Sequence, residues 1–292
     1  MKRTRIAVIA AAAALILGAC GNAGEGDKNP VDTKVDKDAA AQFEDGTRMK
    51  EIAEAGKVKI GVKFDQPGLG FKTAGEDLPA GFDVEMGKLI AAKLGIKAAD
   101  VEWVETISDN REPFLQKGTV DFVLASYSIT DDRRKVVGQA GPYFLTGQQL
   151  LVKKGSDIKS IEDAKGKEIC SVTGSTSLAT AETKGAKVRG FETYSQCRDQ
   201  VLDGAIEAMT TDGSILLGYA ALNPDELEVV GDTFSEERIG IGYAKDKPEL
   251  CKFVTDTIKK AQDDGDWATA FEATLGKSGA TTPEPPAMDP CT

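Results

Sequence analysis

The chain of 292 residues contains no histidine, and this absence argues against two common kinds of site. Histidine is the most frequent general base near neutral pH and the most frequent zinc ligand in proteins. Positive charge is also in the minority, because 36 Lys and Arg stand against 47 Asp and Glu, for a net charge of −11. A nucleic-acid partner requires a basic face, so we expect none. An acidic surface favours solubility outside the cell over attraction to an anionic membrane.

The apolar stretch at residues 6–18 is too short for a membrane-spanning helix, which needs roughly 20 residues. It follows a basic head and ends in Leu17-Gly18-Ala19-Cys20, a pattern that indicates a secretory signal peptide over 1–19. The small residue before Cys20 resembles the lipobox of bacterial lipoproteins. That resemblance implies a lipid on the Cys20 sulfur, which would anchor the protein to the outer face of the cell membrane. An uncleaved helix with an incidental cysteine is the alternative.

The next segment, residues 20–46, is rich in Gly, Asp, Lys and Ala and predicts a flexible tether. Beyond it, strands expected at 58–62, 101–104 and 121–125 alternate with helices at 83–94 and 111–117. This βαβ alternation predicts a parallel sheet covered by helices.

The same alternation restarts with strands expected at 149–152, 168–172 and 205–209, and a further strand at 239–243 leads back to the first unit. We therefore expect an α/β fold of two lobes with the second inserted into the first. Lobe 1 would hold 47–147 and 240–292, and lobe 2 would hold 148–239. Two extended crossings near 146–152 and 238–244 would form a hinge between them.

Four cysteines remain when Cys20 is set aside, and an even number in an exported protein suggests disulfides. Three connectivities are open. We favour Cys170–Cys197, which would lie within lobe 2, and Cys251–Cys291, which would tie the C-terminal tail to a helix. No Cys-x-x-Cys or Cys/His spacing indicates a metal or redox site, and we expect no metal and no cofactor.

Polar residues follow the strand that ends at Ala125 in lobe 1. Ligands of open α/β sheets bind beyond the carboxyl ends of strands, and a helix N-terminus attracts an anion. Ser126 and Ser128 stand at this point, and Arg133 lies in the first turn of the following helix. The planar guanidinium of Arg133 suits a carboxylate. An exposed arginine in a charged turn is the alternative.

Lobe 2 repeats this arrangement where Gly174, Ser175 and Thr176 follow a strand and open a helix. Their hydroxyl and N–H groups suit the other side of the same carboxylate, although simple N-capping would explain the hydroxyls as well. The spacing of a phosphate-binding loop is absent. Asp212 ends an apolar strand and suits an ammonium group, unless it only caps the helix expected at 214–221.

An ordered set of motifs resembles the polar amino-acid-binding proteins of ABC importers, which have the type II periplasmic-binding-protein fold. The motifs are Gly81-Phe82-Asp83, Asn110-Arg111, Ser126-x-Ser128-Ile129-Thr130-x-x-Arg133, Pro142-Tyr143-Phe144, Gly174-Ser175-Thr176 and Thr211-Asp212. The resemblance covers roughly residues 50–275. The proline-rich tail with a cysteine at its end is similar to that of glutamate-binding lipoproteins from actinobacteria.

This resemblance implies a role for each candidate residue. Arg133 would clamp the ligand α-carboxylate together with Ser128, Ser175 and Thr176. Asp212 would hold the α-ammonium, with the carbonyl of Ser126 as a second acceptor. The side chain of an acidic ligand would meet Lys63, Arg111, Ser108 and, as a wall, Tyr194. The alternatives are that Lys63 is solvated and that Arg111 only braces its lobe.

The sequence therefore predicts a monomeric binding protein that captures an acidic amino acid, glutamate first, by lobe closure and delivers it to the permease subunits of an ABC importer. A binder of glutamine or asparagine is the nearest alternative. An enzyme on the same scaffold is disfavoured because no paired acid and base can be recognised. A sensory role would require a partner that carries the signalling domain.

Overall fold

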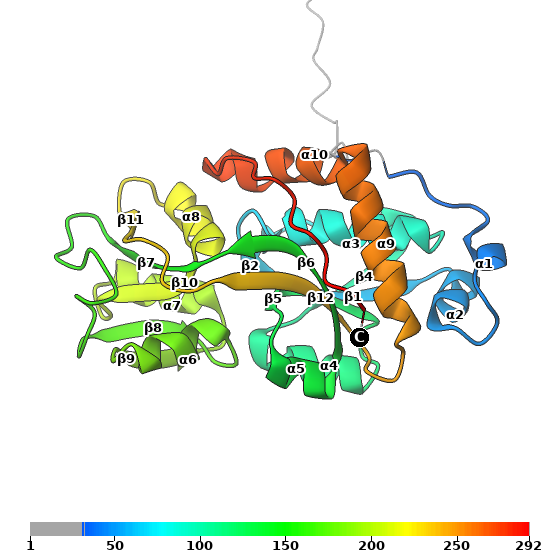
Figure 1. Ribbon diagram of the computed structural model, residues 1–292. Helices are drawn as coiled ribbons and strands as arrows, with labels where there is room; N and C mark the ends of the chain where they lie inside the picture. Colours follow the sequence, from blue (N-terminus) through cyan, green and yellow to red (C-terminus); the bar gives the residue numbers. More distant parts are fainter. Residues whose placement is uncertain (1–30, 32, 292) are drawn as a thin grey trace, which may run out of the picture.

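The computed structural model describes residue 31 and residues 33–291, and Figure 1 shows them as two lobes joined by long strands. The signal peptide expected over 1–19, the lipid site Cys20 and the first part of the expected tether lie outside the described residues. Within the described part of the chain, no helix is long and apolar enough to span a bilayer.

Lobe 1 is built on a five-stranded sheet in the order β4-β1-β5-β12-β6. Strand β1 pairs in parallel with β4 and β5, whereas β12 runs antiparallel to both β5 and β6. The strands are β1 (Val58–Val62), β4 (Val101–Glu105), β5 (Phe122–Ser128), β6 (Gly138–Thr146) and β12 (Glu237–Tyr243). All seven residues of β5 are buried, so this central strand is covered on both faces.

Helices cover both faces of this sheet (Figure 1). One layer contains α3 (Phe82–Lys93), α9 (Glu249–Asp264) and α10 (Asp266–Ala273), and the other contains α4 (Arg111–Gln116) and α5 (Asp131–Val136). Phe82 begins α3 at the centre of an aromatic cluster. Its ring lies 5.4 Å from that of Trp267 and 5.6 Å from that of Phe271, both in edge-to-face geometry, which aromatic pairs prefer.

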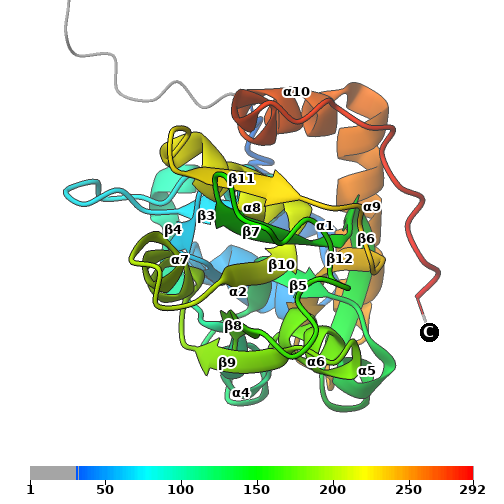
Figure 2. The ribbon, with the colours of Figure 1, turned by 90° about the vertical axis from the view of Figure 1, so that its left-hand side faces the viewer.

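Lobe 2 is built on a second five-stranded sheet, which faces the viewer in Figure 2 in the order β11-β7-β10-β8-β9. Its strands are β7 (Gln148–Lys153), β8 (Glu168–Val172), β9 (Lys187–Phe191), β10 (Ala208–Asp212) and β11 (Leu227–Val230). The helices that cover it are α6 (Thr176–Thr183), α7 (Tyr194–Leu202) and α8 (Gly213–Leu222).

Both sheets are mixed, which corrects the expectation of purely parallel sheets. In lobe 1 the antiparallel pairs arise because β6 leaves the lobe and β12 returns to it alongside. In lobe 2, β7 is antiparallel to β10 and β11. Strand β10 also begins three residues later than expected, because Ala205 and Ile206 donate their N–H groups to the Gln200 carbonyl and close the end of α7.

The chain before β1 is more ordered than the expected tether. Val31 is 1% exposed, and the Asp36 N–H donates to the Ala92 carbonyl at 2.9 Å. Helix α1 (Ala39–Gln42) precedes α2 (Arg48–Ala55), and Phe43 packs edge-on against Phe253 of α9. Residue 31 and residues 33–46, which were expected to belong to a flexible tether, therefore pack on lobe 1, because apolar side chains in this segment find partners there.

Both favoured disulfides are formed. Cys170–Cys197 joins β8 to α7 within lobe 2, and Cys251–Cys291 joins α9 to the end of the tail. The tail crosses lobe 1 as an extended segment (Figure 1), and the Asp289 carboxylate accepts from Arg134 at 2.8 Å and also from Arg238. The C-terminal segment is thus fastened beside the β12 crossing.

Candidate functional site

A small polar cavity of about 10 Å³ lies between the two lobes. Residues from both lobes line it: Gln66, Ser108, Arg111, Ser126, Ser128, Ser175, Thr176, Ser177, Tyr194, Asp212 and Ile215. All the predicted ligand-binding residues are in this set except Lys63 and Arg133, each of which donates a hydrogen bond to a lining serine. A space of this size holds about one water molecule, so the lobes must part to admit anything larger.

The end of β5 is turned sharply at Ser126, which has a φ of 45°. This left-handed conformation is unusual for a residue other than glycine, and such residues cluster at functional sites. The Ser126 N–H donates to Asp83 at 2.8 Å, and its hydroxyl donates to the Gln66 side chain at 2.6 Å. Burial raises the pKa of Asp83 to about 6, although the hydrogen bonds from Tyr143 and Ser126 oppose this shift. Asp83 and Gln66 together hold the turn.

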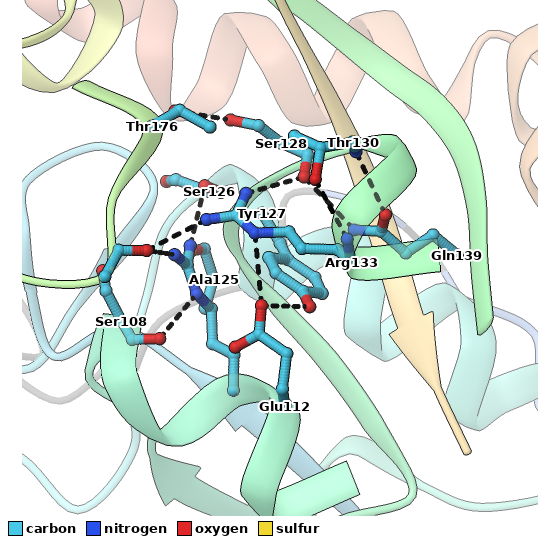
Figure 3. A network of polar contacts seen from close by, with 12 residues as sticks. Ser108, Glu112, Ala125, Ser126, Tyr127, Ser128, Thr130, Arg133, Gln139 and Thr176 are labelled. Atoms are coloured by element: carbon cyan, nitrogen blue, oxygen red, sulfur yellow. Dashed lines mark hydrogen bonds and ion pairs between the residues drawn. The ribbon is translucent and has the colours of Figure 1, made fainter. Parts of the chain in front are cut away.

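Arg111 and Arg133 lie side by side against the ring of Tyr127. Their guanidinium carbons are 4.7 and 4.8 Å from the ring centroid, within the range of a cation–π contact. Arg133 also donates to the Ser128 carbonyl at 2.7 Å and pairs with Glu112 at 3.2 Å (Figure 3). Arg133 is therefore a buried, braced cation, and the alternative of an exposed surface arginine is wrong.

Both arginines donate across the cleft to a single acceptor in lobe 2, the carbonyl of Gly174, at 3.1 and 3.0 Å. Burial and the neighbouring Arg133 lower the pKa of Arg111 to about 10. Since two cations converge on a neutral oxygen, a carboxylate would be a stronger partner at this point. Gly174 has a φ of 76°, a left-handed conformation that favours glycine, and a Cβ there would also displace the Asp109 carboxylate, whose nearer oxygen would lie 2.2 Å away.

The hydroxyl groups of Ser175 and Thr176 in lobe 2 have different hydrogen-bond partners. Ser175 caps α6, because its oxygen accepts from the Leu178 N–H at 3.1 Å and its hydroxyl donates to the Val172 carbonyl. The capping alternative thus describes its side chain. Thr176 instead donates to Glu237 at 3.1 Å and lies 3.4 Å from the hydroxyl of Ser128 across the cleft (Figure 3). The cleft is therefore bridged by Thr176, with the α6 N-terminus beside it.

Asp212 is 4% exposed at the end of β10, and its carboxyl makes no side-chain hydrogen bond with a described residue. It does not cap α8, so that alternative is wrong. Burial and the nearby Glu237 raise the pKa of Asp212 to about 8, although Arg111 and Arg133 oppose the shift. A buried carboxyl without a partner is costly, and a cation bound beside it would relieve that cost.

Lys63 is 3% exposed, so the alternative of a solvated lysine is wrong. Its ammonium donates to the Ser108 hydroxyl at 2.9 Å, and burial together with Arg111 lowers its pKa to about 7. Arg111 braces lobe 1 by donating to the carbonyls of Ser108 and Ala125, yet it also lines the cavity. The Ser126 carbonyl, expected to accept from an ammonium, accepts from Arg111 at 3.3 Å.

Tyr194 begins α7 and is 3% exposed, as a wall residue should be. Burial and the charge of Asp212 raise the pKa of its phenol. Three lining residues were not predicted from the sequence, namely Gln66, Ser177 and Ile215, and Gln66 is the one that carries an unpaired polar group. Gln66 is fully buried, and its amide nitrogen has no hydrogen-bond partner within residues 33–291 or at residue 31. The only signal for it was its position in the loop that follows the first strand and its lysine.

No group of three or more His, Cys, Asp or Glu among the described residues is arranged to hold a metal ion. The cavity instead combines the carboxyl of Asp212 from lobe 2 with the guanidinium of Arg111 from lobe 1 and hydroxyls from both lobes, and Arg133 and Lys63 lie directly behind the lining. This set is complementary to a small zwitterion, since ammonium and carboxylate groups would each meet an opposite charge.

Comparison with known proteins agrees with this chemistry. Residues 58–277 match the model of the bacterial extracellular solute-binding proteins, family 3. The chain is 35% identical over 259 residues to the glutamate-binding protein GluB of Corynebacterium efficiens, covering 84% of this chain and 88% of that protein. It is 34% identical over 263 residues to the ABC transporter glutamine-binding protein GlnH of Bacillus subtilis, covering 89% and 92%.

Among solved structures, an ancestral arginine-binding protein bound to arginine has a TM-score of 0.70 at 36% identity, covering 75% of this chain and 98% of that chain. These three proteins are named for three different amino acids. Side-chain preference within this group therefore has to come from the residues around the cavity.

Proposed function

The chain belongs to family 3 of the bacterial extracellular solute-binding proteins, and we propose that it captures an acidic amino acid, glutamate first, and delivers it to an ABC importer. The observation that carries this proposal is the charge pattern of the cavity. Asp212 has no hydrogen-bond partner on the lobe 2 side, and Arg111 and Arg133 converge from the lobe 1 side. An α-amino acid places an ammonium and a carboxylate a few ångströms apart, and this arrangement supplies a partner for each.

The α-carboxylate would take the place of the Gly174 carbonyl beside Arg133, with Ser128 and Thr176 as further donors. The ammonium would lie at Asp212. Ser175 would act through its N-cap position at α6 rather than through its hydroxyl.

The proposed preference for a ligand with an acidic side chain rests on the number of buried cations at and beside the cavity. One carboxylate and one ammonium would pair with Arg133 and Asp212. Arg111 and Lys63 are both buried, and neither forms an ion pair with a described carboxylate, although Glu112 lies near Arg111 and Asp65 near Lys63. A second carboxylate would complete the charge balance, and it would raise the lowered pKa of Lys63 by restoring an opposite charge beside it. Ser108, Tyr194 and the free amide of Gln66 would surround that side chain.

Glutamine is the second candidate ligand. With a pKa of about 7, Lys63 loses its charge readily, and a neutral lysine with Gln66 and Ser108 would suit a carboxamide. The relative named for glutamine is almost as similar to this chain as the one named for glutamate. Charge at Lys63 therefore decides between the two ligands.

We propose a lipid anchor at Cys20, which would keep the binding protein at the outer face of the membrane near its permease subunits. Binding as a monomer would follow from a site built wholly from the two lobes of one chain. The expected domain limits were 47–147 with 240–292 for lobe 1 and 148–239 for lobe 2. Because β12 pairs with β5 and β6, we propose to move residues 237–239 from lobe 2 to lobe 1.

The test is isothermal titration calorimetry of the chain from Gly21 with glutamate, aspartate, glutamine and arginine in parallel. We expect the tightest binding with glutamate and a one-to-one stoichiometry. Folded protein that gives no heat with any amino acid would refute the proposal, and glutamine binding tighter than glutamate would replace the ligand.

A further inference from the structure

A short hairpin of lobe 1 reaches between two helices of lobe 2. Its strands are β2 (Asp65–Gln66) and β3 (Gly70–Phe71), and they follow β1 directly. In Figure 1, β2 lies at the boundary between the lobes. The hairpin touches the backbone of α8, because a Cβ on Gly218 would lie 2.3 Å from the Pro67 carbonyl oxygen. This is a direct lobe-to-lobe contact outside the residues that line the cavity.

Asp65 carries the polar part of this contact. One oxygen of its carboxylate accepts from the N–H of Tyr194 at 2.7 Å and from that of Ser195 at 3.2 Å. These are the first two residues of α7, and the only backbone N–H of the described chain that donates to the side chain of the N-cap, Thr193, is that of Gln196. Asp65 therefore satisfies donors that the helix cap leaves free, and its negative charge lies at the positive end of the helix dipole.

A second helix of lobe 2 binds the same residue. The Tyr219 hydroxyl of α8 donates to the Asp65 carbonyl and lies 3.4 Å from its carboxylate. Tyr219 is 1% exposed, and Arg198 of α7 stacks on its ring with a distance of 5.4 Å to the centroid. Asp65 thus contacts α7 and α8, two of the three lobe 2 helices whose residues line the cavity.

We propose that Asp65 is an interlobe latch: it fixes α7 against lobe 1 when the lobes close, and so sets the stability of the closed form without contacting the ligand. Asp65 does not line the cavity, but Tyr194, whose N–H it accepts, does. When the lobes part, water can replace the carboxylate at both N–H groups, so the contact is reversible. The inference rests on the proposed capture by lobe closure but not on which amino acid is captured.

The chain offers a matched control in Asp163. Its carboxylate also accepts from two backbone N–H groups, those of Lys159 and Ser160, each at 3.0 Å. All three residues belong to lobe 2, so this interaction is the same in open and closed forms. Asp163→Asn should therefore disturb the fold as much as Asp65→Asn does, but it should leave closure alone.

The test compares wild type, Asp65→Asn and Asp163→Asn in three measurements: the dissociation constants of glutamate and glutamine, the glutamate release rate by stopped flow, and the closed fraction by FRET. Dyes on non-natural residues at the exposed positions 54 and 184 would report the lobe separation. Hydrogen bonds to a charged group are strong enough that Asp65→Asn should weaken both ligands about tenfold, mainly through faster release, with an unchanged ratio between them. The closed fraction should fall in Asp65→Asn only.

Three results would overturn the latch. One is wild-type affinity and release in Asp65→Asn, and another is a loss confined to one ligand, which would make Asp65 a specificity residue. The third is a lowered melting temperature with an unchanged closed fraction, which would make its role purely structural. If wild type binds no amino acid, the proposed function fails, whereas the FRET comparison of the proteins alone still decides whether Asp65 holds the lobes together.

Discussion

The two lobes contribute opposite charges to the cavity, and they hold those charges in different ways. In lobe 1 the cations are braced by neighbours: Arg133 by Glu112, Tyr127 and a carbonyl, and Lys63 by Ser108. In lobe 2 the carboxyl of Asp212 is buried, and none of the residues that the structure describes donates a hydrogen bond to it. Lobe 1 is therefore preorganised for an anion, whereas lobe 2 depends on a cation that arrives from outside.

This difference has a consequence for the order of binding. A preorganised half can hold a ligand while the cleft is open, since its hydrogen bonds do not require the other lobe. The other half gains its partner only when closure brings Asp212 to the ligand. Lobe 1 would thus determine capture, and lobe 2 would determine how strongly the closed form is retained. Five predictions test this division and the side-chain pocket beside it.

The largest effect is expected for Arg133→Ala in lobe 1. The change removes the main carboxylate donor and leaves Glu112 without its cation. Truncating one partner of a buried charge pair typically costs 2–5 kcal/mol, so affinity should fall roughly 100-fold or more for every amino acid, by calorimetry. Arg134→Ala is the matched control, because Arg134 lies on the same helix but pairs with Asp289 of the tail. Equal losses in the two variants would mean that α5 matters only as a scaffold.

Asp212→Asn should be next in size and should act mainly on release. An amide keeps the shape of the side chain but not the charge that pairs with an ammonium. We expect affinity to fall about tenfold to 100-fold, with the dissociation rate raised more than the association rate is lowered, in stopped-flow fluorescence. A fall confined to the association rate would assign capture to lobe 2 and break the proposed division between the lobes.

The same residue should give closure a pH dependence. In the closed cleft the pKa of Asp212 is about 8, well above its ordinary value near 4. Between about pH 4 and pH 8, the carboxyl of Asp212 therefore takes up a proton when the lobes close without a bound cation. The stabilisation of the closed form by protonation of Asp212 is fully present below about pH 4 and is lost as the pH rises through about 8. The closed-to-open ratio of the protein alone, by FRET, should therefore fall at least about tenfold from pH 5 to 8.5.

Asp212→Asn is the control for this profile. Lys63, whose pKa is lowered to about 7, shifts in the opposite sense, but it is present in both proteins. The difference between the two profiles thus reports Asp212 alone. Glutamate should flatten the wild-type profile, because its ammonium stabilises the ionised carboxylate. Parallel profiles in wild type and Asp212→Asn would show that this carboxyl does not titrate on closure.

Lys63→Met should change selectivity more than overall affinity. The methionine keeps the apolar length of the side chain but offers neither charge nor donor to the ligand. We expect glutamate to weaken about tenfold and glutamine to weaken less than threefold, measured by parallel titration, because only glutamate brings a second carboxylate. Equal losses for both ligands would mean that Lys63 only supports Ser108 and does not read side-chain charge.

The sequence predicted what depends on local pattern. Alternating strands and helices predicted the two lobes, the even number of cysteines favoured the two disulfide pairs among three connectivities, and the polar ends of strands predicted five of the lining residues. The family resemblance added Ser108, Arg111 and Tyr194 to the lining. It did not predict what depends on tertiary geometry. The positive φ of Ser126 arises because Asp83, 43 residues earlier, accepts its N–H, and the antiparallel pairing of β12 follows from the route of the chain between lobes.

Gln66 belongs to this second group, and it gives the smallest expected effect. Its amide oxygen accepts from Ser126, while its nitrogen is buried without a partner. In Gln66→Leu the protein alone should keep its melting temperature within a few degrees, because the lost hydrogen bond is offset by removing an unsatisfied donor. Glutamate affinity should nevertheless fall about threefold to tenfold, the value of one hydrogen bond. Calorimetry measures the change in affinity, and thermal melts measure the change in stability. Unchanged affinity would mean that Gln66 does not bind the ligand side chain, which would then contact Lys63, Arg111 and Ser108.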